Sequence, residues 1–179
     1  MKEKKDRKGI ILTLFIAFIM ITSVLGFVFS GDNSQSSVEY NGYTFTRTEN
    51  GWASYIRDQY LYFTYSPADL TSDPFNVFSI NSEKVYIAYN PSEMDVVLQN
   101  SIDRLRYIFS LNGIIAYPAC SIEDGCPDIP IVNCDDGFPI ISFRKSDQNR
   151  ISTDGTCIVL EGYFVKNTDR LSYWLLGVM

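Results

Sequence analysis

The sequence contains no histidine among its 179 residues. Histidine is the commonest general base and the commonest metal ligand, so its absence removes every Ser-His and Cys-His catalytic couple. The usual phosphate-binding and nucleophile motifs are also missing, namely Gly-x-Gly-x-x-Gly, the Walker loop and Gly-x-Ser-x-Gly. The sequence therefore nominates no catalytic residue, no metal ligand and no cofactor.

Positive charge is scarce outside the N-terminus. Residues 1–9 carry five Lys or Arg residues against two acidic ones, and because the whole chain has a net charge of −6, residues 10–179 carry −9. An acidic domain repels phosphate backbones, so we predict no nucleic-acid partner. The hydrophobic share of 46% and the aromatic share of 15% exclude a disordered chain.

Residues 10–30 form an uncharged, mostly apolar stretch behind the basic residues 1–9. As a helix this stretch would span about 32 Å, close to the roughly 30 Å of a bilayer core. The positive-inside rule then predicts a cytoplasmic tail over residues 1–9, a transmembrane signal anchor over residues 10–30 and an extracytoplasmic remainder at the cell membrane. A cleaved signal peptide ending near Ser30 is the alternative, and it exports the remainder as well.

The exported part is expected to be one domain. Small polar residues predict a linker over residues 31–38, which leaves residues 39–179 for the domain. Alternating side chains followed by turn residues predict an antiparallel β-meander at its start. The expected strands are residues 43–48, 52–56 and 60–65, with turns at Asn50–Gly51 and residues 57–59.

The second half of the domain mixes helices with strands. A strand at residues 85–89, a helix capped by Ser92 and ended by Gly113, and a strand at residues 114–116 predict a βαβ-like unit. The apolar face of that helix is expected to consist of Met94, Leu98, Ile102, Leu105 and Ile108. Two more strands are expected at residues 139–143 and 156–161, separated by a polar loop at residues 145–155, and a last helix is expected from Thr168. The predicted fold class is α+β.

All four cysteines lie in the exported domain, at Cys120, Cys126, Cys134 and Cys157. An even number of cysteines outside the cytoplasm predicts two disulfides. Three pairings are open, and we favour the one that closes the short, glycine-containing loop from Cys120 to Cys126 and ties the loop at Cys134 to the strand at Cys157. A redox-active pair or a zinc site is disfavoured, because neither Cys-x-x-Cys nor two short cysteine pairs occur.

Acidic residues gather among these cysteines, at Glu123, Asp124, Asp128, Asp135 and Asp136. Several carboxylates together suit a calcium site, and two of them suit sugar hydrolysis. The spacing matches neither the Asp-x-Asp-x-Asp-Gly calcium loop nor an acid–base pair. We therefore interpret these residues as solvated loop carboxylates.

Nine aromatic residues lie between residues 40 and 65. Such a set, if exposed on one sheet face, could stack on sugar rings or hold a partner protein. We favour cross-strand packing instead, because the alternation of side chains places only about half of them on either face.

The chain ends in an unusually apolar run that includes Trp174, Leu175 and Val178. The favoured interpretation is a last helix that docks into its own domain. The alternative is a contact for a partner subunit or for the membrane surface through these three side chains.

Three tracts resemble small membrane-anchored archaeal proteins of uncharacterised function. They are Asn41-Gly42-Tyr43 through Trp52, then Cys126-Pro127-Asp128-Ile129-Pro130, and finally Asp169-Arg170-Leu171 with Leu176-Gly177-Val178. The resemblance implies an anchored domain with cysteines, and it implies no activity or cofactor.

Two functional hypotheses follow. The leading one is a non-catalytic binding or assembly module, attached to the membrane through residues 10–30, whose partners are other membrane or envelope proteins. The alternative is an extracytoplasmic enzyme or thiol-redox protein that uses the Cys- and Asp-rich stretch 120–136.

Overall fold

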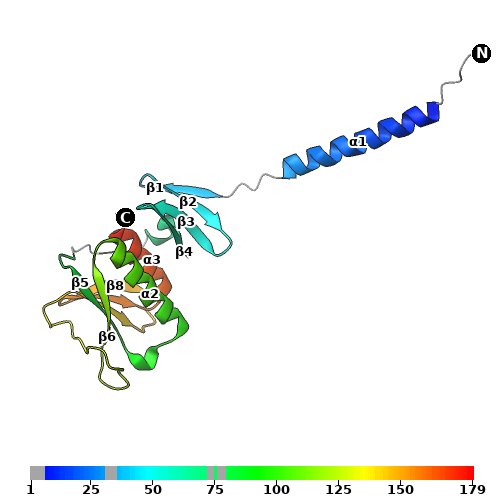
Figure 1. Cartoon of the computed structure of the whole chain (residues 1–179). Coiled ribbons are helices and arrows are strands. Elements are labelled where there is room, and N and C mark those ends of the chain that lie inside the picture. The colour runs from blue at the N-terminus through cyan, green and yellow to red at the C-terminus, as the bar shows by residue number, and fades with distance from the viewer. Residues whose placement is uncertain (1–6, 31–35, 72–74, 76–79) are drawn as a thin grey trace, which may run out of the picture. The chain divides into compact units, whose positions relative to one another are not determined.

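The computed structural model describes residues 7–30, 36–71, 75 and 80–179, which divide into two compact units, Met1–Ser36 and Ser37–Met179 (Figure 1). Most of the predicted cytoplasmic tail and most of the predicted linker, residues 1–6 and 31–35, lie outside the described residues.

The first unit holds one helix, α1, from Arg7 to Ser30. Side chains are described for residues 11–23, and the large apolar side chains there are at least 50% exposed (Ile11, Leu12, Leu14, Phe15, Ile16, Phe18, Ile19, Met20 and Ile21). Within the described part of the chain, no helix is both long and apolar enough to qualify as a membrane span.

The second unit begins with a four-stranded antiparallel meander in the order β1-β2-β3-β4 (Figure 1). Its strands are β1 Ser37–Tyr40, β2 Tyr43–Thr48, β3 Gly51–Ile56 and β4 Gln59–Phe63. The predicted meander is confirmed. The prediction missed β1, because residues 37 and 38 were assigned to the linker and residues 39 and 40 to the segment before the first expected strand. The turn Asn41–Gly42 between β1 and β2 has φ values of 47° and 81°, which suits a two-residue hairpin.

A five-stranded mixed sheet follows, in the order β6-β5-β7-β9-β8. Its strands are β5 Lys84–Tyr89, β6 Ile115–Cys120, β7 Ile140–Arg144, β8 Arg150–Asp154 and β9 Cys157–Glu161. All neighbours pair in parallel except β8, which pairs antiparallel with β9. Helix α2, Val96–Leu111, joins the parallel strands β5 and β6, so the predicted βαβ unit is confirmed. The prediction missed β8, because Ile151 is its only aliphatic residue.

Helix α2 starts later than predicted. Its N-cap is Asp95, whose Oδ1 accepts a hydrogen bond from the Leu98 amide at 2.8 Å. Ser92 was wrong as the cap, because it lies in a separate 3₁₀ helix, η2 Pro91–Glu93, after which Met94 is extended. Gly113 has a φ of 71° just past the helix end, as predicted. An earlier 3₁₀ helix, η1 Pro67–Leu70, occupies part of the predicted loop after the meander.

Helix α3, Phe164–Leu175, begins four residues before the predicted start at Thr168. Thr168 is instead buried inside the helix. The N-cap Tyr163 makes no side-chain capping bond, so the sequence carried no cap signal here. The start is set by packing, because the Phe164 ring meets the Phe143 ring edge-on at 5.3 Å.

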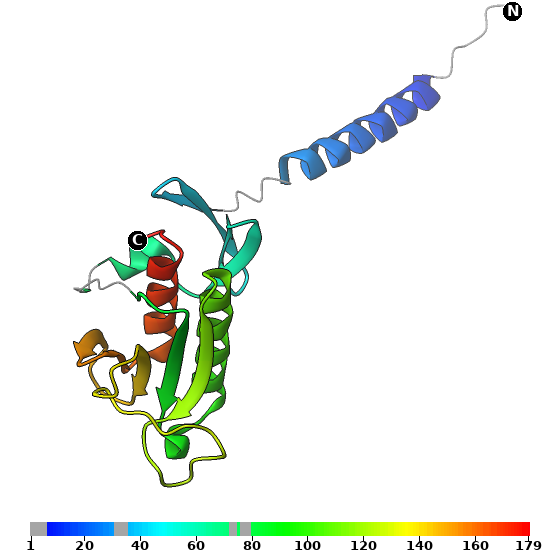
Figure 2. The ribbon, with the colours of Figure 1, turned by 60° about the vertical axis from the view of Figure 1, so that its left-hand side comes forward.

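Helices α2 and α3 lie side by side and cover one face of the mixed sheet (Figure 2). Leu98, Leu105 and Leu171 of these helices pack with Ile87 and Ile141 of the sheet to form the main core. A second core joins the meander to the helix ends through Phe45, Phe63, Ile108, Tyr173 and Val178. A third, smaller core lies on the opposite sheet face, where residues 121–139 cover Ala88, Ala119, Ile140 and Val159 through Val132 and Phe138.

The C-terminal run docks into its own domain, as favoured. Val178 is fully buried in the second core, so the alternative of a partner contact at Val178 is wrong. Trp174 and Leu175 are half-buried and pack against the cores.

The outer edge of β6 is largely unavailable for pairing. Pro118 lacks an amide hydrogen, the Ala116 carbonyl accepts from Arg106, and Cys120 pairs with residues 130–132 through its amide and its carbonyl. The sheet is therefore closed to strand addition on this side.

Candidate ligand-binding cleft

The carboxyl ends of the parallel strands β5, β7 and β9 meet at one edge of the mixed sheet. The chain leaves β5 through α2 to reach β6 on one side, and it later enters β7 on the other side. Open sheets bind ligands in the crevice outside the carboxyl ends of the strands, where the connections diverge in this way. Both helices also begin at this edge, because α2 follows β5 and α3 follows β9.

A cleft of about 680 Å³ lies at this edge, within the size range of small-molecule sites. Three loops line it: the start of α2, the loop after β7, and the turn from β9 into α3 (Asp95, Val97, Lys145, Ser146, Asp147 and Gly162–Lys166), and Tyr65 completes it. A second cleft of about 650 Å³ shares Tyr65, Tyr163 and Lys166 with the first and adds Arg47, Thr64, Asp69 and Asn149. We call the two together the carboxyl-edge cleft.

Three cations and three carboxylates line the carboxyl-edge cleft. Lys145, Lys166 and Arg47 line it, against Asp95, Asp147 and Asp69. Two of the acids already serve local structure. Asp95 caps α2, and the Oδ2 of Asp69 accepts from the amide and the hydroxyl of Ser66 at 3.0 and 2.7 Å. The formal charges of the lining therefore balance, whereas residues 37–179 as a whole carry ten Lys or Arg against eighteen Asp or Glu, a net charge of −8.

The first turn of α3 adds partial positive charge to the same cleft. No side chain caps this helix, and Phe164, Val165 and Lys166 line the cleft. Gly162 lets the loop after β7 approach closely. Its φ is +85°, and a Cβ at this position would lie 2.5 Å from the carbonyl oxygen of Gln148. Asn149 holds the turn by accepting from the Tyr163 amide at 3.0 Å.

A buried carboxylate next to Gly162 of the cleft is paired with two arginines. Glu161 ends β9 with its side chain 6% exposed, and it pairs with Arg144 at 3.6 Å and with Arg150 through a close hydrogen bond. That hydrogen bond and the charge of Glu161 raise the pKa of Arg150. Glu161 therefore does not offset the lysines of the cleft.

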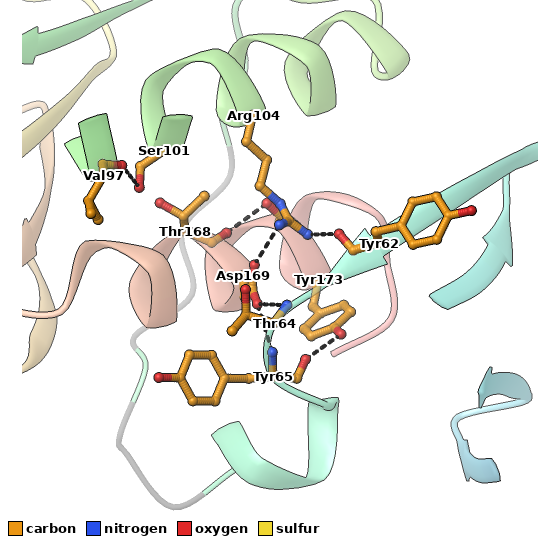
Figure 3. A network of polar contacts seen from close by, with 10 residues as sticks. Tyr62, Thr64, Tyr65, Val97, Ser101, Arg104, Thr168, Asp169 and Tyr173 are labelled. Atoms are coloured by element: carbon orange, nitrogen blue, oxygen red, sulfur yellow. Dashed lines mark hydrogen bonds and ion pairs between the residues drawn. The ribbon is translucent and has the colours of Figure 1, made fainter. Parts of the chain in front are cut away.

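The Tyr65 wall of the carboxyl-edge cleft is held by a buried polar network (Figure 3). The Oδ2 of Asp169 accepts from the amides of Thr64 and Tyr65 at 2.8 and 2.9 Å. Its Oδ1 pairs with Arg104 at 3.3 Å, and the Tyr173 hydroxyl donates to the Tyr65 carbonyl at 2.7 Å. Asp169 thus fixes the chain that leaves the meander against both helices.

Burial shifts both titratable groups of this network. It raises the pKa of Asp169, although Arg104 and the two amides oppose the rise. Burial and the nearby carboxylates also raise the pKa of Tyr173 well above that of a free phenol, so Tyr173 acts as a neutral hydrogen-bond donor.

The four cysteines form the favoured pairs Cys120–Cys126 and Cys134–Cys157, with S–S distances of 2.07 and 2.02 Å. The structure leaves no free cysteine, so the chain offers no thiol for the alternative redox hypothesis in this state. Both disulfides act on the segment that covers the third core, because they tie residues 126 and 134 to β6 and β9.

The five carboxylates at residues 123, 124, 128, 135 and 136 are all exposed, and none of them lines the carboxyl-edge cleft. Asp136 accepts from the Asn133 amide at 2.7 Å, which is a local turn bond. Among the described residues, no three His, Cys, Asp or Glu side chains converge as metal ligands do. The stretch 120–136 and the cleft are therefore different places in the molecule.

The aromatic residues of the meander divide between its two faces. Phe45 and Phe63 pack against Tyr173 in the second core, with ring centroids 5.5 and 4.2 Å from it. Tyr55, Tyr60 and Tyr62 lie on the outer face and are 54%, 70% and 65% exposed. The favoured cross-strand packing is present on the outer face as well, where Tyr55 and Tyr60 are paired with ring centroids 5.1 Å apart, but the rings of that face stay exposed to solvent.

Sequence reasoning missed the residues of the carboxyl-edge cleft. One signal was available. Lys145 and Gly162 directly follow two expected strands, and the predicted βαβ unit indicated that the sheet contains parallel strands, whose carboxyl ends meet at one edge. Lys166 was placed before the last helix, so its position in the first turn was not visible.

The chain matches no family model, and no curated protein or solved structure is significantly similar to it.

Proposed function

We propose that the chain is a non-catalytic binding domain, tethered to the outer face of a membrane through residues 10–30. The carboxyl-edge cleft binds the carboxylate or phosphate group of an extracytoplasmic ligand. The observation that carries this proposal is the meeting of Lys145, which follows β7, with Lys166 and the uncapped first turn of α3 at the carboxyl edge of the parallel strands.

The location rests on three features. The basic residues 1–9 precede an uncharged stretch of bilayer length, the described apolar side chains of α1 are exposed, and two disulfides tie the following unit together. Disulfides persist in oxidising compartments outside the cytoplasm.

The ligand class rests on charge. Lys145, Lys166 and Arg47 supply charged donors to the carboxyl-edge cleft, and the first turn of α3 supplies backbone amides. The source of the anionic group is either a free solute or an acidic segment of a membrane or envelope protein.

Binding is tested on the full chain in detergent by calorimetric titration with inorganic phosphate, with citrate and with a Glu-rich peptide. We expect binding that weakens with salt and falls about tenfold or more when Lys145 and Lys166 are both changed to Ala. The matched control is Lys84→Ala, an exposed lysine at the amino end of β5. Phosphate or citrate binding identifies a solute site, and binding of the peptide alone identifies a protein site. Equal affinities of the double variant and the control would refute the cleft.

The location is tested separately by adding protease to intact cells. Cleavage of residues 31–179 is expected while a cytosolic marker stays intact. A protected chain recovered in the cytosolic fraction would refute the tether and leave the cleft experiment unaffected.

A further inference from the structure

The outer face of the meander presents three tyrosines on two adjacent strands. Tyr55 of β3 lies directly opposite Tyr60 of β4, with ring centroids 5.1 Å apart, and Tyr62 follows two residues later on the same face. Thr44, Thr46 and Thr48 of β2 share this face. Hydroxyl-bearing side chains therefore make up most of it, and Ala53 is its aliphatic member on β3.

A groove of about 340 Å³ lies between the edge strand β4 and helix α2. Tyr60 and Tyr62 line one side and Asn100, Arg104 and Tyr107 line the other, while the buried Leu61 and Ile108 lie beneath. The volume is at the lower end of the range for small-molecule sites. This groove shares no residue with the carboxyl-edge cleft.

The polar groups of the groove are held in place before any ligand arrives. Arg104 donates to the Tyr62 carbonyl, pairs with Asp169 at 3.3 Å and stacks on Phe63 at 4.8 Å from its centroid. The Tyr107 hydroxyl donates to Gln59 at 3.3 Å. Groups that are already fixed lose little side-chain entropy when a ligand binds. A small ligand that makes few contacts can therefore still bind.

The groove carries no net charge. Arg104 is the only charged side chain among its lining residues at neutral pH, and it is paired with Asp169. An anionic ligand would gain little here, in contrast to the carboxyl-edge cleft. The groove therefore suits a neutral ligand that has both apolar faces and many hydroxyl groups.

We propose that Tyr60 and Tyr62, with Asn100, Arg104 and Tyr107, form a binding site for a neutral carbohydrate. The C–H faces of a sugar ring pack on the electron-rich faces of tyrosine rings, and its hydroxyls bond with amide, guanidinium and phenol groups. Tyr55 and the threonines of β2 extend the site for a longer glycan. This inference does not depend on the carboxyl-edge cleft.

A protein partner is the competing occupant, because tyrosine is also enriched at protein interfaces. The features above favour the sugar. The site is a groove sized for a small ligand, and the flanking sheet face carries threonines where a protein interface has an apolar core.

The test uses the full chain in a zwitterionic detergent without a sugar head group, applied to an array of neutral oligosaccharides of hexoses and N-acetylhexosamines. The strongest binder is then titrated by calorimetry. We expect Tyr60→Thr and Tyr62→Thr each to weaken binding by about three- to tenfold, and Tyr60→Phe to retain most of it. Threonine keeps strand propensity, so these exposed positions should stay folded. Tyr117→Thr, an exposed tyrosine on β6, is the matched control and should bind as the wild type does.

Three results would overturn the proposal. They are no binding to any neutral oligosaccharide of the array, binding that the control weakens as much as the groove variants do, and loss of a purified protein partner in the groove variants without any loss of sugar binding. The last result would assign the tyrosines to a protein interface.

Discussion

Two segments lie against the βαβ part of this domain, and they are held there in different ways. The meander, Ser37–Phe63, is attached without covalent links, through Phe45, Phe63 and the polar network of Asp169. The segment 121–139 has little regular structure, and it is attached by two disulfides and one bridge between Cys120 and Ile131.

The difference follows from what each segment can bury. The meander pairs its own backbone in ladders and turns two phenylalanines inward, so packing and the Asp169 network together offset its entropy cost without a crosslink. The segment 121–139 places few apolar side chains in the third core, chiefly Val132 and Phe138. The two disulfides therefore stabilise this segment where burial of apolar side chains is small, as disulfides do in small secreted domains.

The largest expected effect is the loss of the longer crosslink. Replacing Cys134 and Cys157 together by Ser should lower the free energy of unfolding by about 3 kcal/mol, because the unfolded chain regains the entropy of a long loop. Urea denaturation measures this loss. Amide hydrogen exchange should rise in residues 121–139 and stay unchanged in the meander. A uniform rise in both would show that the two segments are not held independently.

The corresponding change in the attachment of the meander is Asp169→Ala. It removes the acceptor of two amides and the partner of Arg104, which is 25% exposed. We expect a loss of about 2–3 kcal/mol in the free energy of unfolding at pH 7, below the full cost of an unpaired buried charge because Arg104 reaches solvent. Exchange should rise at Thr64 and Tyr65 while residues 121–139 keep their protection. Unchanged exchange at these two amides would contradict the assigned role.

The same variant tests the titration of Asp169. Burial raises its pKa, so the folded state binds a proton more tightly than the unfolded state does. The stability contributed by this group is therefore greatest below the ordinary carboxyl pKa of 3.8 and falls as the pH rises through the raised value. Tyr173, which faces it, stays neutral in this window because burial raises its pKa further above that of a free phenol. The difference in free energy of unfolding between wild type and Asp169→Ala should shrink with rising pH, and a difference that grows would contradict this sign.

The shorter crosslink should matter less. Replacing Cys120 and Cys126 by Ser opens a small loop, for which the chain-entropy estimate is about 2 kcal/mol. The Cys120 backbone keeps its bonds to residues 130 and 132, so the end of β6 should stay paired. Urea denaturation of the two double variants side by side gives the ranking, and a larger loss for this pair would contradict it.

The smallest effect is expected for Tyr173→Phe. It removes the hydroxyl that donates to the Tyr65 carbonyl and leaves the stacked ring on Phe63 in place. One hydrogen bond contributes about 1 kcal/mol net, so thermal unfolding should shift by a few degrees only. A loss above that of Asp169→Ala would show that the hydroxyl, and not the carboxylate, is the main tie to the meander.

Local patterns were enough to predict the meander, the βαβ unit and the disulfide pairing. Alternation, a capped amphipathic face and cysteine placement each act over a few residues, and these signals are visible in one sequence. The starts of the two helices were wrong, because Phe164 is set by packing on Phe143 and Asp95 replaced Ser92 after an extended Met94. Strand β8 was missed because its pairing with β9, and not its composition, makes it a strand.

Local sequence patterns could not predict the carboxyl-edge cleft. Tyr65, Asp95, Lys145 and Tyr163 come from four separate parts of the chain, and only the strand order brings them to one edge. Strand order depends on long-range pairing, for which a single sequence offers no direct measure. The sequence showed nine aromatic residues in the meander but did not single out the three exposed tyrosines, and the groove beside them depends on where α2 packs.

The blocked edge of β6 acquires a particular meaning for a protein crowded onto a surface. Copies held in two dimensions meet one another at high effective concentration, so any open strand would invite sheet-to-sheet polymerisation. This edge of β6 is not open to strand pairing with a neighbouring copy, because of Pro118, the Arg106 side chain and the bridged Cys120. On the proposed membrane surface, crowded copies would therefore not form fibres along this side, and their contacts would be made elsewhere, for example at the groove of Tyr60 and Tyr62 or at the carboxyl-edge cleft.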